Sequence, residues 1–364
     1  MKPMQINSET IEYFVRNRKR WNEAYFGTGN VSRTPAYAQL HEYAMVHSPL
    51  TGEEFYTDGE TLVHWEARTA HELRLDIPDI TFDCYNIEVE ALGGEVRYFD
   101  DKAPGLINPP VEKKSELLQL EPPDPYRDGR MPFVFEIIEE YENVFGCFPR
   151  LNVTAPFTLA AKLRGVQNFL MDIVRDSRFV KDLLSFVTEE VLEPYIDAIR
   201  ASREHEGEII AADAIASPPN LDLDLLEELA LKPLLELKKS CGDDVVILNW
   251  WGESHVKVPD RLMELKIRAS SGNVLEGQDP DVNEIGPEGF RDFALSHDSS
   301  LILGVGTDIM MMGDPASVRE RVERYIKVGE EMKGNFLLYF TNLVGDTPLE
   351  NIRAAIGALN GSDN

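Results

Sequence analysis

The feature that most constrains the fold is a regular alternation of strand-like and helix-like segments after residue 150. Short runs rich in Val, Ile and Leu are each followed by a longer segment with apolar residues at helical spacing. Strands are predicted at residues 150–157, 208–216, 244–251, 272–278, 300–308 and 335–342. Helices are predicted at residues 159–174, 176–207, 222–242, 259–271, 286–297, 314–334 and 348–359. At least five successive β–α units predict a parallel sheet, and so many units favour one closed (β/α)₈ TIM barrel over an open sheet.

The first part of the chain fits the same α/β class. Residues 8–27 read as a helix, with Ser8 as a candidate cap and Gly27 at its end. A short strand is predicted at residues 34–40 and a second helix at 59–76. We therefore expect a helical N-terminal extension over residues 1–30 and a single barrel over residues 31–364.

Composition narrows the class of protein. The chain has 364 residues, of which 43% are hydrophobic and 27% are charged, as is usual for globular domains. No run approaches 18 apolar residues, and the first ten residues contain no apolar secretory segment. Its three cysteines (Cys84, Cys147 and Cys241) are scattered, which favours neither a disulfide framework nor a zinc knuckle. A cytoplasmic location is expected.

The formal net charge of −28 argues against two kinds of partner. Nucleic acid phosphates and anionic membranes would both be repelled by so acidic a surface. Several motifs are also missing: the P-loop, a G-x-G-x-x-G turn after a strand, the G-x-S-x-G elbow and H-E-x-x-H. Nucleotide chemistry, serine hydrolysis and zinc proteolysis therefore have no support.

The stretch VILNWWGESH, residues 246–255, begins as an apolar strand and ends in a polar and aromatic cluster. In a barrel enzyme, the carboxyl ends of the strands hold the chemistry. The two tryptophans predict an apolar wall for a substrate, whereas core packing is the alternative.

Three further stretches resemble the uroporphyrinogen decarboxylase superfamily when taken together. They are APFTLAAKLRG at 155–165, DTPLENIRAAI at 346–356 and EALGGEV at 90–96, in the same order and spacing from about Val31 onward. The resemblance implies a TIM barrel with its site at the carboxyl ends of the strands. Function stays open, because the superfamily contains both porphyrinogen decarboxylases and corrinoid-dependent methyltransferases.

Departures from the family patterns favour one branch. The arginine-rich motif of the decarboxylases is replaced by PAYAQLHEYAMVHSP at 35–49, although Asp83 lies within one position of their aspartate. The H-x-C zinc ligands of the thiol-methylating members are replaced by Asn249-Trp250-Trp251, and their later cysteine by Thr341. What remains resembles the O-demethylase type, which moves a methyl group from a small donor, such as a methoxylated aromatic, to the cobalt of a corrinoid protein.

The candidate residues cluster at predicted strand ends. Catalytic candidates are Glu276, His255, Glu253, Asp213 and Asp83. Candidates for substrate binding are Tyr43, His47, Asn86, Glu88, Asn249, Trp250, Trp251, Met310 and Asn342. Glu276 and His255, with Glu253 as a further donor, could hold zinc or form an acid–base pair. For each residue the alternative is structural: core packing, a buried hydrogen bond or a solvated ion pair.

We therefore expect a cobalamin-dependent methyltransferase whose corrinoid is carried by a partner protein. Its expected partners are a small, largely apolar methyl donor and that corrinoid protein, with a homodimer as an open alternative to the monomer. A uroporphyrinogen-type decarboxylase and a catalytically inactive binding barrel are the competing hypotheses.

Overall fold

The computed structural model describes residues 5–28, 31, 33–204, 207–270 and 274–361. Its strands are β1 (Ala36–Ala38), β2 (Glu95–Arg97), β3 (Gly105–Asn108), β4 (Leu151–Thr154), β5 (Ile209–Ala212), β6 (Val245–Val246), β7 (Val274–Gln278), β8 (Ser300–Val305) and β9 (Phe336–Phe340). Its α-helices are α1 (Ser8–Tyr25), α2 (His41–Val46), α3 (Gly52–Tyr56), α4 (Gly59–Glu72), α5 (Cys84–Ala91), α6 (Met131–Phe145), α7 (Pro156–Arg164), α8 (Val166–Arg175), α9 (Ser177–Ser185), α10 (Glu193–Ala201), α11 (Leu223–Leu226), α12 (Lys232–Cys241), α13 (Pro259–Ala269), α14 (Asp281–Ile285), α15 (Pro287–Ser296), α16 (Thr307–Met312), α17 (Pro315–Gly329) and α18 (Leu349–Leu359). Short 3-10 or π segments are η1 (Lys114–Gln119), η2 (Phe186–Leu192), η3 (Ser202–Glu204), η4 (Glu227–Leu231), η5 (Glu253–His255) and η6 (Glu330–Met332).

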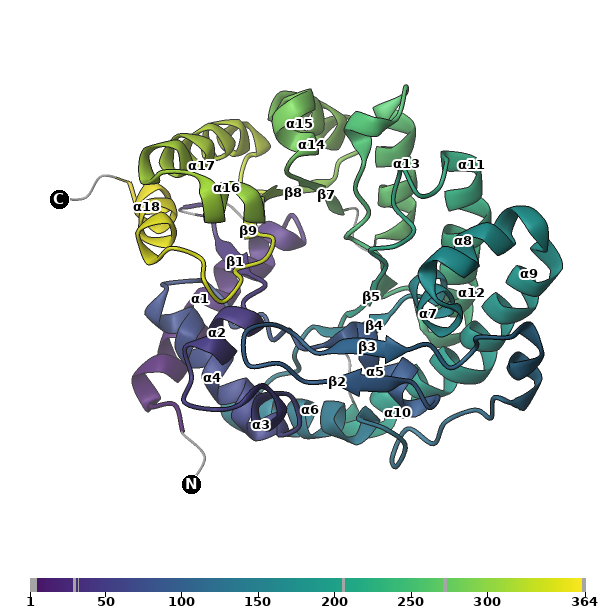
Figure 1. Ribbon diagram of the computed structural model, residues 1–364. Helices are drawn as coiled ribbons and strands as arrows, with labels where there is room; N and C mark the ends of the chain where they lie inside the picture. Colours follow the sequence, from purple (N-terminus) through teal and green to yellow (C-terminus); the bar gives the residue numbers. More distant parts are fainter. Residues whose placement is uncertain (1–4, 29–30, 32, 205–206, 271–273, 362–364) are drawn as a thin grey trace.

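Seven parallel strands form two hydrogen-bonded arcs. One arc has the order β1-β9-β8-β7 and the other the order β4-β5-β6. Figure 1 shows these strands around a common centre with the helices outside them. The predicted parallel α/β fold is confirmed.

An extended segment, residues 77–83, lies between β1 and β4. The Asp76 N–H donates to the Ala36 carbonyl (2.8 Å), and Asp79 forms an ion pair with Arg150 just before β4 (3.3 Å). The segment carries no assigned strand. Among the described residues, backbone hydrogen bonds therefore form two separate arcs of strands and not one continuous ring. The closed eight-stranded barrel stays a prediction.

Two apolar clusters hold the fold together. The larger one fills the space between the helices and the outer faces of the strands. The smaller one lies inside the ring of strands and includes Trp21 and Tyr25 of α1 together with Val246, Ile302 and Leu337. Because α1 fills one end of the ring, it belongs to the same packing unit as the strands.

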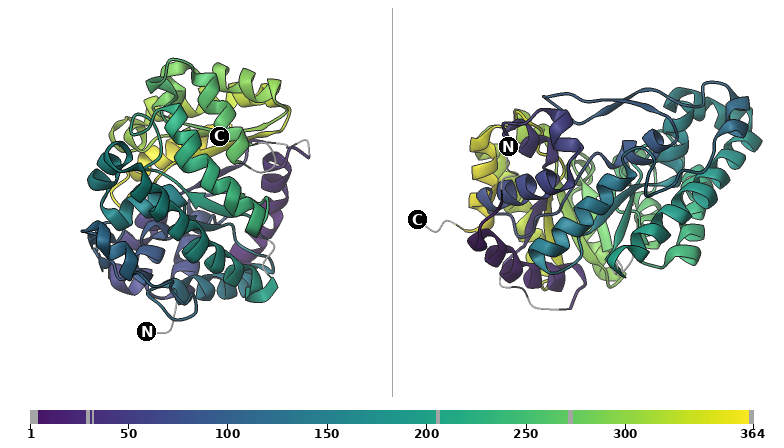
Figure 2. Two further views of the ribbon diagram at one scale, coloured as in Figure 1. Left: turned by 90° about the vertical axis from the view of Figure 1, so that its right-hand side faces the viewer. Right: turned by 90° about the horizontal axis from the view of Figure 1, so that it is seen from below.

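The opposite end of the ring is crossed by the antiparallel β2–β3 hairpin. Seen from the side, this hairpin and α1 lie at opposite ends of the molecule (Figure 2, right). Glu88 is a candidate expected at a strand end, but it lies on helix α5, as does Glu90. No helix in the described ranges is long and apolar enough to cross a membrane.

Candidate functional site

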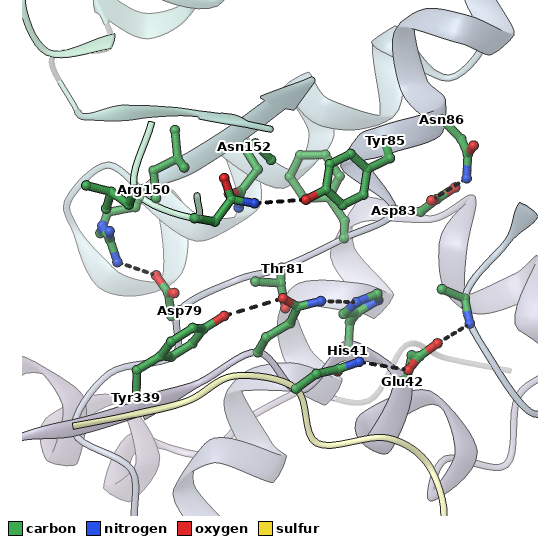
Figure 3. Close-up of a pocket in the computed structure, with 18 of the residues that line it drawn as sticks. His41, Glu42, Asp79, Thr81, Asp83, Tyr85, Asn86, Arg150, Asn152 and Tyr339 are labelled. Atoms are coloured by element: carbon green, nitrogen blue, oxygen red, sulfur yellow. Dashed lines mark hydrogen bonds and ion pairs between the residues drawn. The ribbon is translucent and has the colours of Figure 1, made fainter. Parts of the chain in front are cut away.

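A cavity of about 250 Å³ opens inside the ring at the carboxyl ends of the strands; we call it the lumen pocket. Its lining is polar and includes four acidic side chains, Glu42, Asp79, Asp83 and Glu276, beside Arg150 and Lys162. Figure 3 shows how these walls come from distant parts of the chain: α2, the 77–83 segment, α5, β4 and β9. The remaining lining residues are Tyr37, Gln39, His41, Thr81, Phe82, Tyr85, Asn86, Ala103, Pro104, Asn152, Ile210, Ala212, Leu248, Asn249, Tyr339 and Asn342.

Arg150 closes the floor of the lumen pocket. Its guanidinium pairs with Asp79 (3.3 Å) and Glu208 (3.2 Å) and lies 4.9 to 5.7 Å from the ring centroids of three aromatic side chains. Two of these rings, Trp21 and Tyr25, belong to α1, and the Tyr25 hydroxyl also donates to Glu208. The positive charge of Arg150 is therefore already balanced by two carboxylates, and its guanidinium is packed among aromatic rings. It can contribute little to the binding of an anionic substrate.

Glu276 stands on β7 with its carboxyl group facing the lumen pocket. Only 4% of the residue is exposed, and burial raises its pKa to about 7 even though the Gln278 amide donates to the carboxylate. A Cβ on the next residue, Gly277, would come within 2.6 Å of the Phe290 ring, so this strand is tightly held against α15. The result is a fixed carboxyl group that carries a proton over much of the neutral range.

Two tyrosines stack beside Glu276. The rings of Tyr37 and Tyr339 lie 4.6 Å apart at 20°, and burial, followed by the charge of Glu276, raises the pKa of both hydroxyls well above the usual value. The Tyr339 hydroxyl donates to the Thr341 carbonyl (3.1 Å). These rings give the otherwise polar lumen pocket one flat apolar wall.

Asp83 lies on the opposite wall, before α5. Its carboxylate accepts from Arg130 (2.7 Å) and Asn86 (2.5 Å), yet burial outweighs these bonds and raises its pKa to about 6. Arg130 also binds Glu90 (2.5 Å). Two of the predicted residues, Asp83 and Asn86, are thus joined in one buried network at the lumen pocket.

The mouth of the lumen pocket is held by hydrogen bonds from α2. The Glu42 carboxylate accepts from the Ala103 N–H (2.7 Å) and the Asn342 amide (3.3 Å). His41 is buried, and burial lowers its pKa to about 4, so its ring is neutral and bonds Tyr56 (2.9 Å) and Gln39 (3.2 Å). The amide oxygen of Asn342 is buried without a hydrogen-bond partner in the described structure, which leaves an acceptor available to a ligand.

Asn249 connects the lumen pocket to a buried network behind it. Its amide donates to the Tyr85 hydroxyl (3.0 Å) and its oxygen accepts from the Asp213 N–H (2.9 Å). Asp213 itself is fully buried and accepts from Thr158 (2.7 Å) and from the Trp250 indole N–H (2.9 Å). Burial raises the pKa of Asp213 to about 6.

Several predicted substrate-binding residues lie outside the lumen pocket. Trp250 is fully buried, and Trp251 is half-buried on a loop, where its N–H donates to Ser217 (3.1 Å). Met310 is buried, and Glu88 accepts from the backbone and side chain of Thr154 (2.9 and 2.6 Å), although burial raises its pKa to about 7. The expected apolar wall of tryptophan and methionine is therefore replaced by the tyrosine pair.

The predicted zinc donors do not converge. Glu253 forms a buried ion pair with Lys266 (2.6 Å), and the half-exposed His255 faces Asp281 (3.9 Å). Neither lines the lumen pocket with Glu276. These residues do not fit a zinc site, and we assign no step to a metal there.

One cluster in the described ranges brings three potential metal ligands within 4.8 Å: Glu60, His64 and Glu140. His64 Nδ1 accepts from the Ile6 N–H (3.2 Å), which places the ring proton on Nε2, where it is donated to Glu140 (2.8 Å). With both nitrogens engaged, this histidine has no lone pair for a metal.

Sequence reasoning missed most of the walls of the lumen pocket. Of the predicted residues, only Asp83, Asn86, Asn249, Glu276 and Asn342 line it, while Tyr43 and His47 face a different cavity. The alternation of Asp79, Thr81 and Asp83 was the available signal for a lumen-facing extended segment. No comparable pattern marked His41, Glu42 or Arg150.

Fold and site together define a parallel-stranded α/β protein with an acid-lined pocket at the carboxyl ends of its strands. The family model for uroporphyrinogen decarboxylase (URO-D) matches residues 19–361. The chain therefore belongs to the uroporphyrinogen decarboxylase family, as its three sequence stretches predicted. None of the curated proteins matches it.

A solved structure shares the fold. It is a methyltransferase from Methanosarcina mazei, with 19% sequence identity and a TM-score of 0.74 over 94% of this chain and 98% of that one. At this identity the similarity establishes the fold alone.

Proposed function

We propose that this protein is a methyltransferase that takes a methyl group from a small donor held in the lumen pocket and passes it to the cobalt of a corrinoid carried by a partner protein. The observation that carries the proposal is Glu276, a buried acid on strand β7 that lines the lumen pocket and has a pKa of about 7. Transfer from a methyl ether needs such a group, because an oxide leaving group is poor until it receives a proton. The name of the Methanosarcina mazei neighbour is consistent with the proposal.

The chain's own contribution is binding and proton delivery. The C–O bond of the donor breaks with its electron pair left on oxygen, and Glu276 gives that oxygen its proton. The corrinoid supplies the nucleophile that takes the methyl carbon. Tyr37 and Tyr339 would hold a donor ring, while the free acceptor of Asn342 would bind a hydroxyl or N–H on it.

The size and charge of the lumen pocket limit the donor. A volume of about 250 Å³ lies below the usual range of about 300–1,000 Å³ for sites of drug-sized ligands. Its acidic lining disfavours carboxylate-rich substrates. A small methoxylated aromatic that is neutral and bears a polar substituent fits both limits.

Decarboxylation of uroporphyrinogen is the second candidate, and Asp83 is the observation in its favour. Two observations oppose it: the volume is small for a tetrapyrrole with eight carboxylates, and Arg130 and Arg150 are already paired with acids. We expect no turnover of uroporphyrinogen III by the pure protein; a rate well above background would reverse the ranking.

The decisive experiment is the spectral change of a cobalt(I) corrinoid protein to its methylated form, with a panel of methoxyarenes as donors. Glu276→Gln keeps the shape and removes the proton, so we expect transfer to slow by about 10²- to 10⁴-fold with little change in donor binding. Glu284→Gln, at the exposed end of α14, is the control and should be neutral. If no donor methylates an active corrinoid partner, the catalytically inactive binding barrel becomes the better hypothesis.

A further inference from the structure

A second cavity, of about 600 Å³, lies on the outer flank of the molecule among residues of α2, α4 and α18. We call it the outer cavity. It shares no lining residue with the lumen pocket and is larger than it. Any ligand of the outer cavity is therefore separate from the donor proposed above.

The outer cavity is basic in a strongly acidic chain. Arg68, Arg74 and Arg353 line it against one acid, Glu72. Arg68 is engaged, since it pairs with Glu72 (2.6 Å) and lies over the Trp65 ring (5.2 Å from the centroid). Arg74 and Arg353 have no ion pair or side-chain hydrogen bond within the described part of the chain, so two positive charges remain uncompensated.

Flat rings line the same cavity. Tyr43 and His47 stack with centroids 4.0 Å apart at 21°, and the half-buried Trp65 lies beside them on α4. Tyr43 is only 6% exposed, yet its hydroxyl makes no hydrogen bond to any described residue. Because Tyr43 lines the cavity, its hydroxyl is free to exchange a hydrogen bond with a ligand there.

We propose that the outer cavity binds a planar anion: an aromatic or heteroaromatic ring that packs on Trp65 and the Tyr43–His47 pair and carries a phosphate or carboxylate for Arg353 and Arg74. Guanidinium groups bind both anions through paired hydrogen bonds, and they also stack on rings. The volume is within the range found for ligands of this size. Nothing in this proposal depends on methyl transfer.

The test is isothermal titration of the full chain with adenosine 5′-monophosphate and, separately, with benzoate, which distinguishes phosphate from carboxylate. Adenosine and inorganic phosphate each supply half of the ligand chemistry. We expect one saturable site for at least one of the two planar anions, with adenosine and phosphate binding at least about tenfold more weakly. Raising the salt concentration should weaken binding.

Variants locate the site. Arg353→Gln should weaken binding by about tenfold or more, and Trp65→Leu should weaken the ring contribution. Arg261→Gln on α13 is the control, because this arginine is exposed, as Arg353 is, and lies outside the cavity. Either of two results overturns the proposal: neither probe saturates the protein, or Arg353→Gln binds like the wild type. A wild-type dimer that Arg353→Gln converts to a monomer, with no probe bound, would assign the cavity to a second copy of the chain instead.

Discussion

Glu276 shows how burial turns an ordinary side chain into a reagent. An exposed glutamate has a pKa near 4.3 and no proton to give at neutral pH, whereas the lumen holds this one near 7. Since the proposed step consumes the protonated form, kcat/KM should be flat below about pH 7 and fall about tenfold per pH unit above it. The measurement is the pH profile of methyl transfer. In Glu276→Gln the fall of kcat/KM above about pH 7 should vanish. If the fall persists, another group is responsible for it.

Asp213 is equally buried, but its hydrogen bonds indicate a structural role. Trp250→Phe removes the indole N–H from its carboxylate and should lower the free energy of unfolding by about 1–3 kcal/mol, measured by urea denaturation. The matched control is Trp251→Phe, whose indole N–H makes no hydrogen bond to a described residue, and its effect should stay within about 0.5 kcal/mol. A tenfold rise in the donor KM of Trp250→Phe at unchanged stability would restore the substrate-binding role predicted from sequence.

At the level of elements, α1 provides packing that neither its position in sequence nor its helical pattern revealed. Trp21 is 2% exposed and stacks on Tyr25 at 4.7 Å inside the ring of strands. Trp21→Ala should destabilise the fold by about 3–5 kcal/mol, as expected for a large core deletion. Val15→Ala, on the exposed face of the same helix (56%), should change the free energy of unfolding by less than about 0.5 kcal/mol. If Trp21→Ala and Val15→Ala lowered the free energy of unfolding equally in thermal or urea melts, the role of α1 in closing the ring would be contradicted.

Local periodicity explains which elements could be predicted. Runs such as residues 300–305 are apolar because both of their faces are buried, and the helices that follow them carry a clear apolar stripe. Residues 77–83 alternate Asp, Thr and Asp toward the lumen and escape a search for apolar runs. The site was less predictable because its lining residues come together only in the folded chain. Arg150 lies 108 residues after Glu42 and 189 residues before Tyr339, yet all three line the lumen pocket.

For the whole molecule, buried carboxyl groups set the pH dependence of stability. Burial raises the pKa values of Glu88 and Glu276 to about 7 and those of Asp83 and Asp213 to about 6. Each group binds its proton more tightly in the folded state, so its stabilising contribution is complete below about pH 4 and is lost as the pH rises through 6 to 7. The urea midpoint should therefore be higher at pH 5.5 than at pH 8. Glu88→Gln should reduce the difference between the midpoints at pH 5.5 and pH 8. A wild-type midpoint that rises with pH would contradict this prediction.

Because α1 closes one end of the ring of strands, it also affects the order of binding. With Trp21, Tyr25 and Arg150 sealing the floor, the described walls leave the end crossed by the β2–β3 hairpin as the route in and out. The donor and its demethylated product must then pass through the same opening of the lumen pocket at which the methyl acceptor binds. On the proposed function this requires an ordered sequence, with the donor loaded before the acceptor docks and the product released only after the acceptor leaves. Excess acceptor protein should accordingly inhibit turnover, and this inhibition should be relieved by raising the donor concentration.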